Sequence, residues 1–212
     1  TLIFSVIFIT STSYAFAQMT STHVEDPIVI LETTQGEIII EFFHLDAPKH
    51  VENFILLSEN GDYDGLLFHR IIPGFMIQSG DPNSINGDPN TWGQGGNGAI
   101  SDRINAEFNN IKHDRGIVSM ARAQDPNSAG SQFFIVHKDS HFLDEQYTVF
   151  GRIVTESSFE TLDKIAAVQT GSNDRPFNPE QVRIISATVV ERSDIFNIMN
   201  LSEPSRTGST VT

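Results

Sequence analysis

The sequence predicts a mainly β domain, a closed barrel of eight antiparallel strands capped by two α-helices. Eight short β-rich runs are separated by turn residues, and two amphipathic segments lie far apart in the sequence. Strands therefore do not alternate with helices, as they would in a parallel α/β fold. An antiparallel sheet of this size loses its exposed edges when it closes. With 212 residues, 39% of them hydrophobic, the chain can build the core of one domain.

The first two strands are predicted at Ile28–Thr33 and Glu37–Phe43. The turn Thr34-Gln35-Gly36 between them places a glycine where a hairpin reverses direction. The remaining β-rich runs are Leu67–Ile71, Phe75–Gln78, Gly116–Ala121, Gln132–Val136, Thr148–Val154 and Val182–Val190.

Two helices are predicted from capping signals and apolar faces. The first begins at Asp46-Ala47-Pro48, with Asp46 expected as N-cap, and ends at Gly61. The second covers Ser157–Val168 and opens with a Ser-x-x-Glu capping box at Ser157. The apolar faces consist of Val51, Phe54 and Ile55 in the first helix and of Phe159, Leu162, Ile165 and Ala166 in the second.

The two ends of the chain differ from its body in composition. Leu2–Ile9 is a short apolar run, and Ala15-Phe16-Ala17 fits the Ala-x-Ala site of a signal peptide. We predict a signal peptide at 1–17 with a truncated n-region, a linker at 18–25, a folded body at 26–192 and a polar Ser/Thr-rich tail at 193–212. The protein is then exported, with no stable membrane span after cleavage. A retained anchor and a buried strand are the alternatives for the apolar run.

Charge and composition exclude several kinds of function. The chain has 13 Lys and Arg against 27 Asp and Glu, a net charge of −14. We expect no nucleic-acid binding, because phosphates would be repelled. The lack of cysteine removes disulfides, thiolate catalysis and Cys-type zinc sites. His137 and His141 are four residues apart, but their segment does not look helical, so we expect no metal site.

One strongly apolar segment, FHRIIPGFMIQSGD over residues 68–81, contains an arginine. An arginine buried in such a strand needs hydrogen-bond acceptors, and the sequence around Arg70 offers none. The alternatives to a functional role are that Arg70 reaches solvent or pairs with an acidic residue. Period-two alternation places Phe75 and Ile77 on one face and Met76 and Gln78 on the other.

A second group of segments follows in a fixed order. It consists of Ser119-Met120-Ala121-Arg122-Ala123, the run Asn127–Ile135 with its GSQFFI core, Phe142-Leu143-Asp144 and Phe150-Gly151-Arg152. Taken one at a time, its apolar residues fit plain core packing. Taken together, in this order and spacing, the segments resemble the cyclophilin family of peptidyl-prolyl cis–trans isomerases, over about Ile28–Val190. The resemblance implies an eight-stranded barrel capped by two helices.

The resemblance also implies an active site. Arg70 is the implied catalytic residue. The implied substrate-binding residues are Phe75, Met76, Gln78, Ala121, Arg122, Gln132, Phe134, Phe142, Leu143 and Tyr147. Four of them, Phe75, Met76, Phe134 and Leu143, are expected to form the floor of a proline pocket. Gln78 and Gln132 are expected to bond the substrate backbone, and Arg122 to act through its main chain.

The chain departs from the family pattern in two side chains and one loop. Many eukaryotic members have Trp where this chain has Phe142 and His where it has Tyr147, so these positions resemble prokaryotic-type members. Without the indole N–H we predict weak cyclosporin binding. The loop Asp81–Trp92 also looks longer than in short eukaryotic members.

The expected function is isomerisation of Xaa–Pro bonds in proline-containing polypeptides, assisting the folding of exported proteins. The reaction is non-covalent and needs neither a metal nor an organic cofactor. One alternative is a proline-binding or chaperone-like module with little catalysis, which would not need Arg70. Another is a serine hydrolase, whose Ser, His and Asp would have to meet in a way that their spacing does not indicate.

Overall fold

The computed structural model describes residues 27–194, so the predicted signal peptide, the linker and most of the tail lie outside the described residues. All eight predicted strands are present in one antiparallel sheet. They are β1 (Pro27–Thr33), β2 (Gly36–Phe42), β3 (Arg70–Ile72), β4 (Met76–Ser79), β5 (Ile117–Met120), β6 (Phe133–Val136), β7 (Val149–Val154) and β8 (Ile184–Glu191). Their order across the sheet is β3-β4-β6-β5-β7-β2-β1-β8.

The sheet curls until its two edges approach each other. A bridge joins Leu67, just before β3, to Arg183, just before β8. Two backbone hydrogen bonds flank it, from Phe68 N to the Val182 carbonyl at 2.9 Å and from Ile184 N to the Leu66 carbonyl at 2.8 Å. The barrel therefore closes through the segment ahead of β3.

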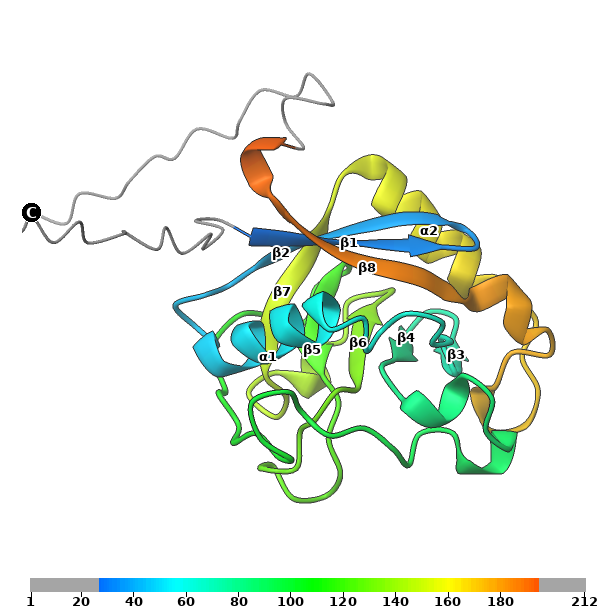
Figure 1. Cartoon of the computed structure of the whole chain (residues 1–212), viewed down its shortest axis with the longest axis horizontal. Helices are drawn as coiled ribbons and strands as arrows, with labels where there is room; N and C mark the ends of the chain where they lie inside the picture. Colours follow the sequence, from blue (N-terminus) through cyan, green and yellow to red (C-terminus); the bar gives the residue numbers. More distant parts are fainter. Residues whose placement is uncertain (1–26, 195–212) are drawn as a thin grey trace, which may run out of the picture.

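Two helices, α1 (Pro48–Glu59) and α2 (Glu156–Ala166), cover the barrel from different sides (Figure 1). Each turns its apolar face to the barrel core, α1 through Val51, Phe54 and Leu57 and α2 through Leu162 and Ile165. None of the helices in the described part of the chain is long and apolar enough to cross a membrane.

The N-terminus of α1 is capped from a distant part of the chain. The helix starts one residue later than expected, so Ala47 is its N-cap and the prediction of Asp46 was wrong. The Glu107 carboxylate accepts the backbone N–H groups of Lys49 and His50 at 3.2 and 3.0 Å. A carboxylate satisfies these free donors and also faces the positive end of the helix dipole.

The cap of α2 also differs from the prediction. Thr155, with a φ of 74°, turns the chain out of β7, and its hydroxyl accepts the N–H of Ser158 at 3.3 Å. The helix begins at Glu156, so Thr155 is its N-cap and the predicted capping box at Ser157 was wrong. The Ser158 hydroxyl is used elsewhere, because it accepts the N–H of Ile39 in β2 at 2.9 Å.

The apolar residues divide into two clusters on opposite faces of the sheet. Along β6, Phe133 and Ile135 belong to the core inside the barrel, whereas Phe134 and Val136 belong to a smaller cluster outside it. Along β4, Ile77 points inward and Met76 packs in the outer cluster. Strand alternation produces this division.

Phe75 does not follow the predicted alternation. It packs in the outer cluster with Met76, not on the face of Ile77. The reason is local: β4 begins only at Met76, and Phe75 lies in the β3–β4 turn, where its N–H bonds the Ile72 carbonyl at 3.0 Å.

Candidate active site

A pocket of about 190 Å³ lies over the outer apolar cluster. It gathers nine of the eleven predicted site residues from strands and loops that are far apart in the sequence. These are Arg70, Phe75, Met76, Gln78, Ala121, Arg122, Phe134, Leu143 and Tyr147. The two remaining predicted residues, Gln132 and Phe142, lie next to it.

The floor of this pocket is apolar and nearly closed to solvent. Met76, Phe134 and Leu143 are 2%, 5% and 8% exposed. The Tyr147 ring meets the Phe134 ring edge-on, with centroids 5.6 Å apart. Such a surface binds a saturated ring through dispersion and the release of water, without demanding a hydrogen bond.

Arg70 stands at the rim of the floor, on edge strand β3 and opposite Gln78 in the ladder. Its side chain is 43% exposed, and its Nε donates to Asp174 Oδ2 at 3.3 Å. Both alternatives considered for this arginine thus hold, solvent access and an acidic partner. Neither removes the guanidinium from the pocket.

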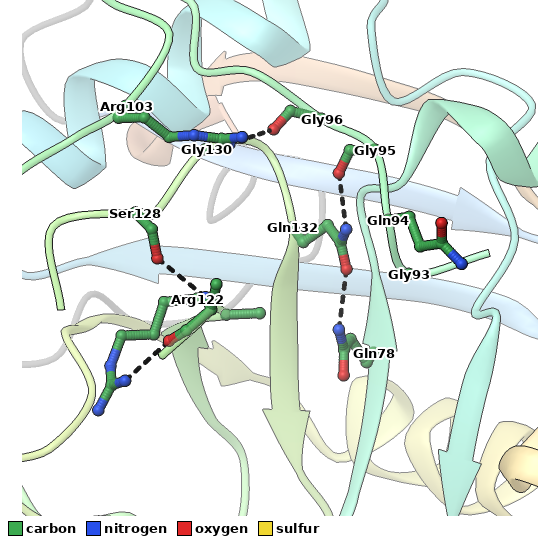
Figure 2. Close-up of a pocket in the computed structure, with 12 residues that line it drawn as sticks. Gln78, Gly93, Gln94, Gly95, Gly96, Arg103, Arg122, Ser128, Gly130 and Gln132 are labelled. Atoms are coloured by element: carbon green, nitrogen blue, oxygen red, sulfur yellow. Dashed lines mark hydrogen bonds between the residues drawn. The ribbon is translucent and has the colours of Figure 1, made fainter. Parts of the chain in front are cut away.

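Two glutamines form a row along one wall. Gln78 Nε2 donates to Gln132 Oε1 at 2.9 Å, and Gln132 Nε2 donates to the Gly95 carbonyl at 2.7 Å (Figure 2). The Ala121 N–H donates to the Gln132 carbonyl at 2.9 Å. Beyond this wall lies a second pocket of about 190 Å³, which shares Gln78, Ala121 and Arg122 with the first.

The row depends on a close approach of the glycine-rich loop. Gly96 has a φ of 102°, and a Cβ there would lie 2.1 Å from the Ser131 hydroxyl. Only glycine adopts this conformation readily and leaves the required space. The glycine-rich segment therefore forms a pocket wall from its backbone.

Arg122 uses its side chain to join two loops. Its Nε and Nη2 donate to the Gln146 carbonyl at 3.1 and 2.9 Å, and its guanidinium lies 4.6 Å from the centre of the Tyr147 ring. This cation–π contact holds the tyrosine against the pocket. The main-chain role predicted for Arg122 stays a prediction.

Phe142 lies beside the pocket instead of lining it. Its side chain is 66% exposed, and its ring centre lies 5.4 Å from that of Phe75. It belongs to the 3₁₀ turn η3 (His141–Leu143), which also supplies Leu143 to the floor.

A buried polar group supports the floor from behind. The His113 ring stacks on Phe134 with centroids 6.1 Å apart, and His113 N and Nδ1 lie 2.9 and 3.0 Å from Asp144 Oδ1. Asp144 directly follows Leu143, so this contact fixes η3. Burial lowers the pKa of His113, although Asp144 opposes this effect. Burial raises the pKa of Asp144, but hydrogen bonds from His113 and Lys112 outweigh it and lower this pKa to about 2.

The same histidine brings a Ser, a His and an Asp together. Ser119 Oγ lies 3.2 Å from His113 Nε2, and His113 in turn bonds Asp144. Ser119 is fully buried, and its hydroxyl donates to the Thr148 carbonyl at 2.9 Å. A nucleophile has to reach its substrate, so this arrangement does not support a hydrolase.

One group within residues 27–194 has the composition of a metal site. The ligand atoms of Asp114, Asp139 and His141 lie within 4.8 Å of one another. All three side chains are exposed, and His141 Nε2 already lies 2.8 Å from Asp114 Oδ1. Asp114 and His141 form a surface ion pair, and we assign the three residues no metal.

Comparison with known proteins decides the family. The model of the family described as "Cyclophilin type peptidyl-prolyl cis-trans isomerase/CLD" matches residues 28–189. The chain belongs to the cyclophilin family. "Peptidyl-prolyl cis-trans isomerase-like 1" of Gibberella zeae is 41% identical over 168 residues, which cover 78% of this chain and 96% of that protein. Further relatives are also named as peptidyl-prolyl cis–trans isomerases, and together these matches identify this cyclophilin as a peptidyl-prolyl cis–trans isomerase.

A solved structure shows the same fold. It is the cyclophilin of Cryptosporidium parvum crystallised in the presence of the dipeptide Ala-Pro. It is 32% identical, with a TM-score of 0.69, and the match covers 77% of this chain and 99% of that one. A putative bifunctional phosphatase/isomerase of Streptococcus pyogenes is 37% identical over 76% of this chain and 38% of that protein. The relatives are mostly eukaryotic and do not support the expected prokaryotic type.

Sequence reasoning missed the residues behind this cyclophilin's pocket. His113, Asp144 and Asp174 contact the predicted site residues or the turns that carry them. His113 and Asp144 are 31 residues apart, and Arg70 and Asp174 are 104 apart. The one local signal was the position of Asp144 directly after Leu143.

Replacing Asp144 tests this support. In Asp144→Ala we expect the free energy of unfolding at pH 7 to fall by about 1–3 kcal/mol, because buried His113 donors lose their acceptor. The folded pKa of Asp144 is about 2, below the unfolded value of about 4. The stability it contributes is therefore present above pH 4 and is lost as the pH falls toward 2.

Urea unfolding between pH 2 and pH 7 measures this difference. The exposed carboxylate Glu160 on α2 serves as the control, and Glu160→Ala should change little at any pH. A difference for Asp144→Ala that stays constant with pH would contradict the assigned role of its charge.

Proposed function

We propose that this isomerase twists the Xaa–Pro amide without forming a covalent bond, with the proline ring on the apolar floor and the Arg70 guanidinium at the prolyl nitrogen. The observation that carries this proposal is the placement of Arg70 at the rim of a pocket floored by Met76, Phe134 and Leu143. Together they offer a site for an apolar ring next to a fixed cation.

The chemistry requires little more than this. Rotation about the bond has a barrier of about 18–20 kcal/mol because resonance keeps the amide planar. Twisting localises the lone pair on the prolyl nitrogen, where a guanidinium N–H can donate to it. A rate increase of roughly 10³–10⁵ over about 10⁻² s⁻¹ needs only about 4–7 kcal/mol of preferential binding to the twisted form.

The glutamine row supplies the anchor for the flanking peptide. In the structure the Gln78 amide donates to Gln132 and the Gln132 amide donates to the Gly95 carbonyl, so both amide groups point along the wall. We propose that a bound peptide exchanges some of these bonds for bonds to its own backbone. Anchoring the chain on both sides of proline lets the enzyme turn one side against the other.

The proposed substrates are proline-containing polypeptides. The related cyclophilin of Cryptosporidium parvum was crystallised in the presence of Ala-Pro, and its fold matches this one. A proline-binding module with little catalysis is the alternative. Its pocket would need the apolar floor but not Arg70, so a variant of Arg70 separates the two functions.

Arg70→Ala should abolish most of the catalysis while the pocket still binds peptide. We expect the enzyme-catalysed exchange rate to fall by about 10²–10³-fold, as when one transition-state donor is removed. NMR exchange spectroscopy on an Xaa–Pro peptide measures the rate, and titration of the same peptide measures its binding. Arg70→Lys keeps the charge but loses the planar guanidinium. Its exchange rate should lie between those of the unmodified protein and Arg70→Ala.

Two results would contradict this assignment in different ways. Unchanged exchange in Arg70→Ala would remove Arg70 from the mechanism. Peptide binding without accelerated exchange in the unmodified protein would favour the proline-binding module.

We further propose that cyclosporin binds weakly, because Phe142 has no N–H to donate. Phe142→Trp restores an indole donor next to Phe75, and should tighten binding by about tenfold, the worth of one hydrogen bond. Isothermal titration with cyclosporin measures this, with Phe142→Leu as the control that adds no donor. Equal affinity in Phe142→Trp and the unmodified protein would contradict the proposal.

Export to assist the folding of proteins outside the cytoplasm is the proposed biological setting. It rests on the apolar run Leu2–Ile9 and on the Ala15-Phe16-Ala17 pattern, both typical of a signal peptide. Mass spectrometry of the protein purified from the cells that make it tests this. A mature N-terminus at Gln18 is expected, and a chain that retains residues 1–17 would overturn the export proposal.

A further inference from the structure

The Arg70 guanidinium has one acidic partner in the described structure, Asp174, which lies near the C-terminal end of the domain sequence. Nε of Arg70 donates to Oδ2 of Asp174 at 3.3 Å, across 104 residues of sequence. Asp174 ends η4 (Ser172–Asp174), in the connection from α2 to β8 that runs beside β3 (Figure 1). Each of the two side chains is 43% exposed.

The turn that carries Asp174 is held on both sides. Its ends are joined by the bridge between Thr170 and Pro176 and by a hydrogen bond from Gly171 N to the Arg175 carbonyl at 2.8 Å. Arg175 Nη1 also lies 3.5 Å from Asn90 Oδ1, in the long loop after β4. The carboxylate therefore projects from a fixed base.

The turn keeps an unfavourable backbone to present this carboxylate. Asn173 and Asp174 have φ values of 62° and 59°, in the left-handed region. Two successive side chains in this region cost free energy that glycine would avoid, although Asn and Asp tolerate it best. Such local strain often accompanies a functional constraint. What Asp174 supplies that glycine could not is the contact with Arg70.

We propose that Asp174 is a positioning residue for Arg70, a role that rests on the function proposed above for that arginine. By accepting the Nε hydrogen, the carboxylate fixes the plane of the guanidinium and leaves both Nη groups for the substrate. A long, half-exposed side chain otherwise loses much of its freedom when it engages the twisted amide. The pair is solvent-exposed, so water screens the attraction and orientation is its main effect.

Three variants separate the carboxylate from the backbone strain. Asp174→Gly removes the carboxylate and relieves the backbone strain. Because relief of strain should not destabilise the fold, a loss of exchange in this variant would reflect the missing carboxylate. Asp174→Asn keeps an acceptor oxygen and a residue suited to the left-handed region, but removes the charge. The matched control, Asn173→Gly, relieves the strain of the neighbouring residue and leaves the Asp174 carboxylate in place.

We expect Asp174→Gly to lower the catalysed exchange by about tenfold, mainly in kcat, because a displaced catalytic group costs rate more than peptide binding. The exchange rate of Asp174→Asn should lie between those of Asp174→Gly and the unmodified protein. The rate of Asn173→Gly should equal that of the unmodified protein. The Arg70 Nε–Hε resonance in NMR spectra should shift in Asp174→Gly and stay in Asn173→Gly.

The decisive measurement repeats Asp174→Gly in an Arg70→Ala background. If Asp174 acts through Arg70, it should have no further effect there. An equal tenfold loss in both backgrounds, or normal exchange in Asp174→Gly alone, would overturn the positioning role. Normal exchange in Arg70→Ala would instead overturn the proposed function of Arg70, which keeps the two failures distinct.

Discussion

The filled interior of the barrel is the constraint on which the rest of this structure depends. Side chains such as Val29, Ile40, Phe133 and Ile135 occupy it, so a polypeptide substrate has no room inside. Among the described residues, the outer face of the sheet is where the apolar pocket lies. A strand that serves both faces must be apolar on both, and β6, with the sequence FFIV, is buried at every position.

The outer pocket therefore needs support that the sheet alone does not give. Residues at its edge lie in loops, and polar contacts between distant segments hold those loops in place. His113 joins Asp144 to the back of Phe134, Gln132 joins β4 to the glycine-rich loop, and Asp174 meets Arg70. Each contact joins segments that are well separated in the sequence, so the site depends on the tertiary fold.

This arrangement is consistent with the proposed reaction, in which no bond to the enzyme is made. A guanidinium stays charged across the ordinary pH range, so its donor function does not depend on proton transfer. The Ser119–His113–Asp144 group shows the contrast. It has the composition of a hydrolytic triad, but Ser119 and His113 are buried and the His113 ring packs against Phe134. Exposure and surroundings, more than composition, decide what such a group does.

The sequence by itself determined the strands, the two helices, the family and nine of the eleven residues predicted for the site, because these depend on local periodicity and on motifs written in contiguous segments. Tertiary structure alone decided the cap of α1 by Glu107, the outward position of Phe75, and the pairing of Arg70 with Asp174. Helix caps and ion pairs of this kind join residues 57 and 104 positions apart, and no local pattern encodes which acidic side chain arrives. For Arg70, the partner is Asp174 because the curl of the sheet brings the α2–β8 connection beside β3.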